Sequence, residues 1–239
     1  MAAVNLLTTR TLCKTYGGLE AVKDVDFALP VGGVRALIGP NGAGKTTFVS
    51  MLCGRISATS GVIEFEGRDV TTLPAHKRIS LGIAYTFQIT SVFANLTAHE
   101  NVALAVQRRL KPEAGRLEAE TMAALARVGL QDRADQQAGD LAYGHQRLLE
   151  IAMGLGQAPK LLILDEPTQG LSDSEITEFK ALIRDVARQT TVLLIEHNID
   201  VVMALADRIT VLNFGQIIAE GTPDEIHANA DVQTAYLGG

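Results

Sequence analysis

Apolar and polar positions follow two different patterns along the chain. In residues 1–90 and 160–239, short apolar runs bounded by glycine or proline alternate with stretches of helical spacing, which is typical of an α/β fold. Residues 91–159 instead carry Ala, Leu, Glu and Arg at helical spacing, with no good strand between them. We therefore predict one domain, residues 1–239, with an α/β core of residues 1–90 and 160–239 and an inserted helical subdomain of residues 91–159.

The same pattern predicts the individual elements. The expected strands are Val4–Lys14, Ala21–Leu29, Val34–Ile38, Gly61–Phe65, Gly82–Phe87, Leu161–Leu164, Thr191–Ile195, Arg208–Leu212 and Gln216–Glu220. The expected helices are Thr47–Cys53, Leu73–Arg78, Thr97–Leu110, Glu113–Val128, Gln146–Leu155, Asp173–Arg188, Ile199–Ala206 and Pro223–Ala228. Thr97 and Glu100 have the form of a capping box, which favours a helix start at that point.

Composition narrows the class of partner. The 239 residues are 47% hydrophobic, enough for a sizeable core, and carry a net charge of −6 with no long Lys/Arg run. This charge balance weighs against a nucleic-acid-binding surface, so we expect no nucleic-acid partner. Cys13 and Cys53 lie far apart in apolar surroundings, and we interpret both as core residues of a protein in a reducing compartment.

No stretch has the character of a membrane anchor. The apolar runs stay well short of the roughly 18 residues that suggest a spanning helix. Met1–Arg10 lacks the basic region followed by an apolar block that marks a signal peptide. We expect a cytoplasmic protein that reaches a membrane only through a partner.

One stretch places a strand, a glycine-rich loop and a helix in the order that phosphate binding requires. It reads Gly39-Pro40-Asn41-Gly42-Ala43-Gly44-Lys45-Thr46-Thr47 and follows Val34–Ile38. The glycines let backbone N–H groups converge on phosphate oxygens, and the helix N-terminus adds positive charge. Lys45 can reach the β- and γ-phosphates, and the Thr46 hydroxyl can ligate Mg²⁺. The alternative is a glycine turn with a chance lysine, which both flanks disfavour.

A second candidate is an apolar strand that ends in two carboxylates. The run from Leu161 to Leu164 is followed directly by Asp165 and Glu166. In a phosphate-loop protein, Asp165 would hold Mg²⁺ through water and Glu166 would polarise an attacking water. An ordinary acidic strand end is the alternative, and the Lys45 loop makes it the weaker interpretation.

Two further polar residues come directly after predicted strands. His197 follows Thr191–Ile195 by two positions, where it can face the same crevice and contact a γ-phosphate. Gln88 follows another strand end, and its amide can contact Mg²⁺ or the attacking water. Either residue taken alone is a weak signal, and a structural role for His197 is the alternative.

The sequence Leu141-Ala142-Tyr143-Gly144-His145-Gln146-Arg147 opens a predicted helix. Gly144 permits close backbone approach, and the helix start offers free N–H groups to an anion. One nucleotide needs one phosphate cradle, so we expect this stretch to contact the nucleotide of another subunit. We assign that contact to residues 142–146, without a chemical role for His145. A plain helix start is the alternative.

Taken together, these motifs resemble the ATP-binding subunits of ABC transporters, and the resemblance covers essentially the whole chain. It matches Gly39–Thr46 to Walker A, Gln88 to the Q-loop, Leu141–Arg147 to the signature, Leu161–Glu166 to Walker B with its catalytic glutamate, and His197 to the switch histidine. Tyr16 takes the place of the aromatic residue that stacks on adenine.

The resemblance implies a fold and a set of partners. The fold is a P-loop NTPase (RecA-like) core with an N-terminal antiparallel β-subdomain and an inserted α-helical subdomain. The cofactors are ATP and Mg²⁺. The Mg²⁺ contacts are Thr46, Gln88 and Asp165, and the catalytic residues are Lys45, Gln88, Glu166 and His197. The partners are a second ATPase subunit, integral membrane permease subunits and, indirectly, a solute-binding protein.

Two departures from the family pattern bear on its activity. The usual signature is Leu-Ser-Gly-Gly-Gln, but here Ala142 replaces the serine and Tyr143 the first glycine. Ser172 stands where an acid or amide usually follows Gly170-Leu171. The run Leu-Ala-Tyr-Gly-x-Gln-Arg, followed by Leu-Glu-Ile-Ala, is similar to LivG-type subunits of branched-chain amino-acid and urea/amide importers. The second ATPase is then a copy of this chain or a LivF-like subunit.

Other functions stay open at this point. The same ATPase could serve a lipid or lipopolysaccharide exporter, or act as a soluble ABC-type switch without a permease. A GTPase is disfavoured because no Asn-Lys-x-Asp run occurs. The sequence does not identify the cargo, since the motor does not touch it.

A permease contact is expected just after Gln88. Residues 89–96 are largely apolar and lie where the two subdomains join, so they either fill the core or form a groove for a permease helix. We favour the groove, with Phe93 as its anchor.

Overall fold

The computed structural model describes residues 4–86, 91–110 and 114–237, and two sheets organise them. The first sheet is antiparallel, with the strand order β2-β1-β4-β5. Its members are β1 (Asn5–Tyr16), β2 (Leu19–Pro30), β4 (Ser60–Phe65) and β5 (Arg68–Asp69). Apolar residues alternate with exposed ones along β2, so one face of this sheet is buried against the rest of the domain.

The second sheet has the strand order β10-β9-β3-β8-β7-β6 and is parallel apart from β10, which runs antiparallel to β9. Its members are β3 (Val34–Ile38), β6 (Ile83–Thr86), β7 (Leu161–Asp165), β8 (Thr191–Ile195), β9 (Arg208–Asn213) and β10 (Gln216–Gly221). Every residue of β3, β7 and β8 is buried, because both faces of a parallel sheet are covered.

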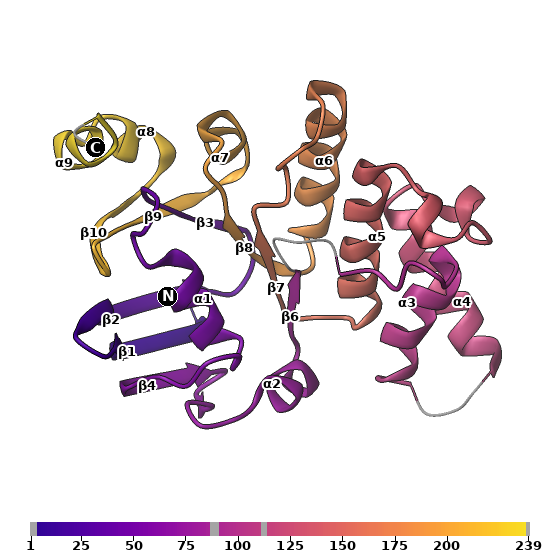
Figure 1. The fold of residues 1–239 in the computed structure, drawn as a ribbon, viewed down its shortest axis with the longest axis horizontal. Coiled ribbons are helices and arrows are strands. Elements are labelled where there is room, and N and C mark those ends of the chain that lie inside the picture. The colour runs from indigo at the N-terminus through magenta and orange to yellow at the C-terminus, as the bar shows by residue number, and fades with distance from the viewer. Residues whose placement is uncertain (1–3, 87–90, 111–113, 238–239) are drawn as a thin grey trace.

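The helices cover this sheet and extend to one side of it (Figure 1). They are α1 (Lys45–Leu52), α2 (Ala75–Leu81), α3 (Ala98–Gln107), α4 (Ala114–Arg127), α5 (Tyr143–Gly156), α6 (Asp173–Val186), α7 (Ile199–Leu205), α8 (Pro223–His227) and α9 (Ala230–Leu237). Two short 3₁₀ turns, Gln131–Arg133 and Ala138–Asp140, lie between α4 and α5. Helices α3, α4 and α5 lie at the opposite end of the molecule from β1, β2 and β4 (Figure 1).

The alternation along β7 decides which side chain faces which layer. Leu161 and Ile163 belong to the apolar cluster that contains α1 and the antiparallel sheet. Leu162 and Leu164 belong to the cluster formed with α5 and α6. Because side chains alternate between the faces of a strand, Asp165 continues on the face of Leu161 and Ile163. The end of β7 therefore directs a carboxylate toward the layer that contains α1.

The expected fold class is confirmed, and the deviations from the predicted elements have local causes. Helix α2 begins at Ala75 and not at Leu73, because Pro74 precedes it in an extended conformation and a residue before proline is disfavoured in a helix. The capping box of Thr97 and Glu100 is confirmed. The sequence analysis missed β5, which is only two residues long, and α9, which carries a weak periodic pattern.

The exposure of the two cysteines tests the expectation that both are core residues. Cys53 is buried in the apolar cluster around α1, as expected. The prediction that Cys13 is a core residue is wrong, because this side chain is only partly buried and its thiol contacts the Asp24 carboxylate at 3.2 Å.

Candidate functional site

The loop between β3 and α1 has a backbone that only glycine allows at two of its positions. Gly39 has φ = 154° and Gly44 has φ = 101°. A Cβ at Gly39 would collide with the Leu212 carbonyl oxygen, and a Cβ at Gly44 would collide with the Ala21 carbonyl oxygen. The loop therefore packs directly against the backbone of Leu212 and Ala21. Without a Cβ at these glycines, its N–H groups can approach a ligand closely.

Lys45 is the first residue of α1, and its ammonium group lies inside the loop. Nζ donates to the carbonyl oxygens of Gly39 at 2.7 Å and Pro40 at 3.1 Å. Burial lowers the pKa of Lys45, while the nearby carboxylates of Glu166 and Asp165 oppose this shift. No side chain caps the start of α1 and no acidic residue lies in its first turn, so its N–H groups are open to an anion.

A cavity of about 750 Å³ adjoins this loop. It brings together Tyr16, the loop, the start of α1 and Glu166, which the chain separates by up to 150 residues. Its lining residues are Tyr16, Gly18, Leu19, Glu20, Ala21, Lys23, Asn41, Gly42, Ala43, Gly44, Lys45, Thr46, Thr47, Glu166, Phe214 and Gly215. Tyr16 is 47% exposed at the end of β1, where an aromatic base can stack on its ring. The cavity thus combines an aromatic platform with a phosphate loop.

The two carboxylates after β7 have different environments. Asp165 is only 2% exposed, and its Oδ2 accepts a hydrogen bond from the Tyr85 hydroxyl at 2.6 Å. Burial raises the pKa of Asp165, and the Tyr85 hydrogen bond counteracts part of that effect. Glu166 has φ = 47°, so the chain turns there and its carboxylate faces the cavity. One carboxylate is buried and held, and the other is open to the ligand space.

The oxygen ligands present fit Mg²⁺ that arrives with a nucleotide. The Thr46 hydroxyl and the Asp165 carboxylate are hard oxygen donors, which Mg²⁺ prefers. Among the residues that the structure describes, no group of three or more His, Cys, Asp or Glu could hold a metal ion. A magnesium ion bound by one or two protein oxygens takes its other ligands from phosphates and water.

His197 lies beside the catalytic candidate Glu166. Its Nδ1 is 3.8 Å from Glu166 Oε2, and its side chain is 58% exposed. The structure therefore brings together two residues that the sequence analysis assigned to the γ-phosphate and the attacking water. Gln88 lies outside the described residues, so its predicted contacts are not placed.

The residue before His197 is a component of the site that the sequence analysis missed. Glu196 is fully buried, and its carboxylate accepts the backbone N–H groups of Thr168 at 3.0 Å, His197 at 3.0 Å and Asn198 at 3.2 Å. It also accepts the Thr168 hydroxyl. Glu196 thereby ties the loop after Glu166 to the loop that carries His197. A carboxylate directly after the apolar run of residues 192–195 is the signal that could have identified it.

The signature residues lie away from the nucleotide cavity of the same chain. Helix α5 begins at Tyr143, and Ala142 at its N-cap provides no side-chain hydrogen bond. None of residues 142–146 is among the described residues that line the cavity. Within the chain, Gly144 packs against the Glu175 carboxylate, and a Cβ at this position would require that side chain to move. Tyr143 is 44% exposed beside this glycine.

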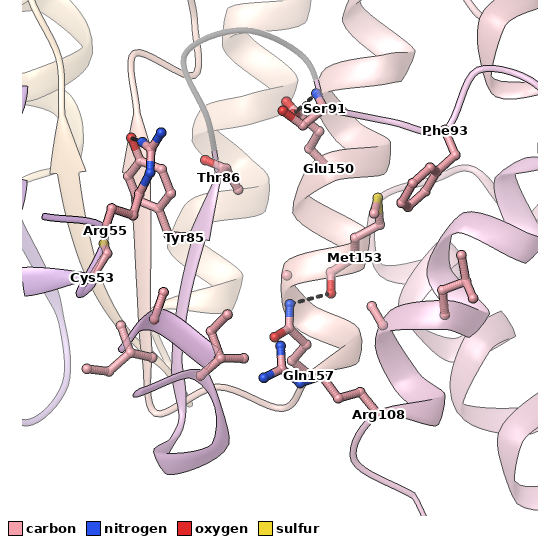
Figure 2. A pocket seen from close by; sticks show the side chains of 16 residues that line it. Cys53, Arg55, Tyr85, Thr86, Ser91, Phe93, Arg108, Glu150, Met153 and Gln157 are labelled. Atoms are coloured by element: carbon pink, nitrogen blue, oxygen red, sulfur yellow. Dashed lines mark hydrogen bonds between the residues drawn. The ribbon is translucent and has the colours of Figure 1, made fainter. Parts of the chain in front are cut away.

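A second cavity, of about 320 Å³, opens between β6 and the helical region. We call it the groove. Its lining is mostly apolar and comes from α2, β6, α3, α5 and the segments that follow α1 and precede α3. The lining residues are Cys53, Arg55, Ala75, Ile79, Ile83, Tyr85, Thr86, Ser91, Phe93, Leu104, Ala105, Arg108, Glu150, Met153, Gly154 and Gln157. Phe93 and Met153 lie on one wall, and Tyr85 with Arg55 lies on the other (Figure 2). Phe93 is 55% exposed, so it is no core residue.

A buried ion pair within the signature helix includes a glutamate that lines the groove. Arg147 and Glu150 on α5 have side chains that are 4% and 6% exposed, and Arg147 Nη1 lies 3.0 Å from Glu150 Oε2. Glu150 also accepts the Ser91 N–H at 2.5 Å, and burial raises the pKa of this carboxyl. The start of the described segment after residue 90 is therefore fastened to α5.

Comparisons with known proteins agree with this geometry. A family model described as ABC transporter matches residues 22–169, and one described as branched-chain amino acid ATP-binding cassette transporter matches residues 216–239. The high-affinity branched-chain amino acid transport ATP-binding proteins BraF of Pseudomonas aeruginosa and LivG of Escherichia coli are 41% and 39% identical, over 98% of this chain and 98% of each relative. A solved ADP conformation of an ATP-binding cassette of an ABC transporter has a TM-score of 0.88 at 28% identity, covering 98% of this chain and 99% of that one.

Proposed function

The chain belongs to the family of ABC transporter ATP-binding proteins, and on that premise we propose that it is the motor of a complex that imports branched-chain amino acids or related amides. As a member of this family it couples ATP hydrolysis to transport. The match of residues 216–239 to the branched-chain amino acid group carries the proposal. This match lies outside the ATPase region common to the wider family, so it bears on the kind of transporter.

The nucleotide cavity supports a division of roles. Tyr16 stacks on adenine, and residues 39–47 surround the phosphates with backbone N–H groups and the Lys45 ammonium. Thr46 and Asp165 hold Mg²⁺, together with Gln88, and bound Mg²⁺ neutralises charge on the phosphates. Glu166 polarises the attacking water and His197 contacts the γ-phosphate. The 3.8 Å separation of His197 and Glu166 supports placing both roles at one end of the cavity.

The position of the signature supports a two-subunit ATP site. Since residues 142–146 do not line the cavity of their own chain, a second subunit has to supply this contact. We propose that ATP lies between Lys45 of one subunit and Gly144 of the other. The second subunit is a copy of this chain or a LivF-like paralogue. Without a serine hydroxyl at Ala142, the trans contact relies on backbone N–H groups at the start of α5.

The groove supports a docking site for the permease. It combines exposed apolar residues, Phe93 and Leu104, with the polar ends of Arg55 and Arg108, which suits an amphipathic helix of a partner. No helix among the described residues is long and apolar enough to cross a bilayer. We place the chain at the cytoplasmic face of the cell membrane, held by permease subunits that receive solute from a solute-binding protein.

The contact between Ser91 and Glu150 supports coupling between the two sites. We propose that residues 91–159 shift as one subdomain when ATP draws the two subunits together. The bond from Ser91 to Glu150 fastens the groove to the helix that carries the signature. A permease element seated in the groove would follow that shift.

Uptake by the complete transporter tests the proposed cargo. The complex is assembled in proteoliposomes with ATP inside, and uptake of labelled leucine is measured against unlabelled valine, isoleucine, urea and short amides as competitors. We expect ATP-dependent leucine uptake that branched-chain amino acids inhibit, or amide uptake in its place. ATP-dependent extraction of lipid or lipopolysaccharide without uptake of either solute class would contradict the importer and favour the exporter.

A further inference from the structure

One side chain contacts both the groove and the magnesium-directed carboxylate. The ring of Tyr85 forms part of the groove wall, next to Arg55 (Figure 2). Its hydroxyl donates to Asp165 Oδ2 at 2.6 Å. None of the nucleotide-binding motifs includes Tyr85, and it has no place in the roles proposed above.

The sheet register explains why Tyr85 reaches Asp165. Strands β6 and β7 are parallel neighbours, with Tyr85 opposite Ile163 and Thr86 opposite Leu164. Side chains alternate along each strand, so Tyr85, Ile163 and Asp165 lie on the same face of the sheet. The phenol extends along that face past Ile163 and meets the carboxylate where β7 ends.

The contact matters because Asp165 is only 2% exposed and has little access to water. A carboxylate in such a place depends on protein donors for its orientation. The Tyr85 hydroxyl holds one oxygen, Oδ2, and this bond fixes the direction of the other oxygen. On the groove side, the Arg55 guanidinium lies 5.4 Å from the centre of the Tyr85 ring, so a partner in the groove contacts a group stacked on that ring.

We propose that Tyr85 is a positioning residue that couples the occupancy of the groove to the orientation of the Asp165 carboxylate. This inference rests on the proposed function, because it takes Asp165 as a contact of Mg²⁺ and the groove as the permease site. A partner that displaces the Tyr85 ring turns the carboxylate, and the fit of Mg²⁺-ATP changes with it. The permease then affects the nucleotide site directly through β6, in addition to the movement of the helical region.

The first test measures Mg²⁺ dependence with the full chain. Tyr85→Phe keeps the ring and removes the hydroxyl. Binding of a fluorescent ATP analogue is titrated with Mg²⁺, and separately measured in EDTA. We expect the half-saturating Mg²⁺ concentration to rise about tenfold, the scale of one hydrogen bond to a charged group, with unchanged binding in EDTA. Thr210→Val is the control, since it removes a buried hydroxyl that donates to the Glu220 carboxylate elsewhere in the sheet.

Asp165→Asn separates this inference from the proposed function. If Asp165→Asn leaves the Mg²⁺ dependence unchanged, the assignment of Asp165 to Mg²⁺ is wrong and the inference falls with it. The other outcome is that Asp165→Asn shifts the Mg²⁺ dependence, whereas Tyr85→Phe has the melting temperature of wild type and causes no shift. In that case only the inference is overturned. If Tyr85→Phe has a lower melting temperature than wild type, the double variant Tyr85→Phe/Asp165→Asn decides the question. We expect Tyr85→Phe to add no shift in Mg²⁺ dependence to that of Asp165→Asn. An added shift as large as that of Tyr85→Phe alone overturns the coupling.

The second test asks whether the groove is involved. The same Mg²⁺ titration is run on the isolated chain and on the complete transporter in nanodiscs. Assembly should change the half-saturating Mg²⁺ concentration of wild type at least threefold and leave that of Tyr85→Phe unaltered. An equal change in both proteins, or none in wild type, overturns the link to the groove.

Discussion

The nucleotide cavity and the groove adjoin the same sheet but are assembled in different ways. The longest continuous part of the nucleotide cavity is residues 41–47, within the loop into which Lys45 directs its ammonium group. The groove takes two or three side chains from each of four elements, α2, β6, α3 and α5, and others from the segments beside them, between residues 53 and 157. Chemistry that every ATP requires is thus encoded locally, whereas the surface for a particular partner is distributed over the fold.

This difference has a consequence for substitution. At Gly39 and Gly44 the backbone itself excludes other residues. In the groove, Phe93 and Leu104 are partly exposed side chains that can change without disturbing an element. We therefore expect changes in the nucleotide cavity to affect every activity of the chain, and changes at Phe93 or Leu104 to affect only activities that need a partner.

The largest effect is expected from Glu166→Gln. The amide keeps the shape of the side chain and cannot act as a base, so hydrolysis should fall by about 10²- to 10⁴-fold while ATP still binds. Phosphate release and size-exclusion chromatography with Mg²⁺-ATP measure the two properties, and an ATP-bound dimer should accumulate. Glu178→Gln on the outer face of α6 is the control. Hydrolysis within a few-fold of wild type would exclude Glu166 as the base, and a protein that stays monomeric would contradict a homodimeric ATP site.

Lys45→Ala should strongly weaken nucleotide binding without loss of fold. The ammonium makes charge-assisted contacts to phosphate worth about 1.5–3 kcal/mol each, so affinity should fall by roughly 10- to 150-fold. Isothermal titration calorimetry with Mg²⁺-ATP measures the loss. Lys160→Ala, which removes a surface lysine paired with Glu66, should bind like wild type. Near wild-type affinity and ATPase activity in Lys45→Ala would refute the assignment of the loop.

Glu196→Gln tests whether the two loops behind the nucleotide cavity depend on one carboxylate. In the wild type, the Glu196 carboxylate accepts hydrogen bonds from four donors. The amide of Gln would place its own NH₂ group against some of these donors, which should lower the free energy of unfolding by roughly 1.5–3 kcal/mol. The melting temperature should fall by about 2–4 °C for each kcal/mol of lost stability in a chain of this size. Glu64→Gln, which changes an exposed pair with Arg10, should have a smaller effect. Equal melting of the two variants would show that the Glu196 contacts contribute little.

Phe93→Ala should have the smallest effect on the isolated chain. Because its ring is 55% exposed, the loss of stability should stay well below the 3–5 kcal/mol that is typical of a core Phe→Ala change. Phe48→Ala, at a fully buried position on α1, should show that full loss. Copurification with the permease should drop for Phe93→Ala while ATP affinity is kept. Unimpaired assembly would move the docking site away from the groove.

Local sequence signals were sufficient to predict most of the helices and strands and the phosphate loop of the nucleotide cavity. The strands Val34–Ile38 and Thr191–Ile195 were predicted with their observed limits, because a fully buried strand is short and mostly apolar. The phosphate loop was recognisable because its residues are consecutive and each has its own physical reason. Helix α9 escaped notice because its apolar and polar residues do not separate onto two faces.

Contacts between distant segments had no such signal. Nothing around Tyr85 indicates that its hydroxyl meets Asp165, 80 residues later. That bond exists because β6 pairs with β7 in one register, and the pairing is set by the packing of the whole sheet. The same holds for Glu196, whose partners lie 28 residues earlier as well as next to it.

By itself, the sequence determined what depends on consecutive residues: the strand, loop and helix around Lys45, the carboxylates at the end of β7, and membership of the ABC family. The tertiary structure decided which of these residues face one cavity, that the signature lies outside it, and that Phe93 is exposed in a groove. The two kinds of information differ in how far along the chain the underlying interactions act. Backbone geometry and hydrophobic periodicity act over a few residues, whereas burial, register and the pairing of buried polar groups depend on the arrangement of the entire chain.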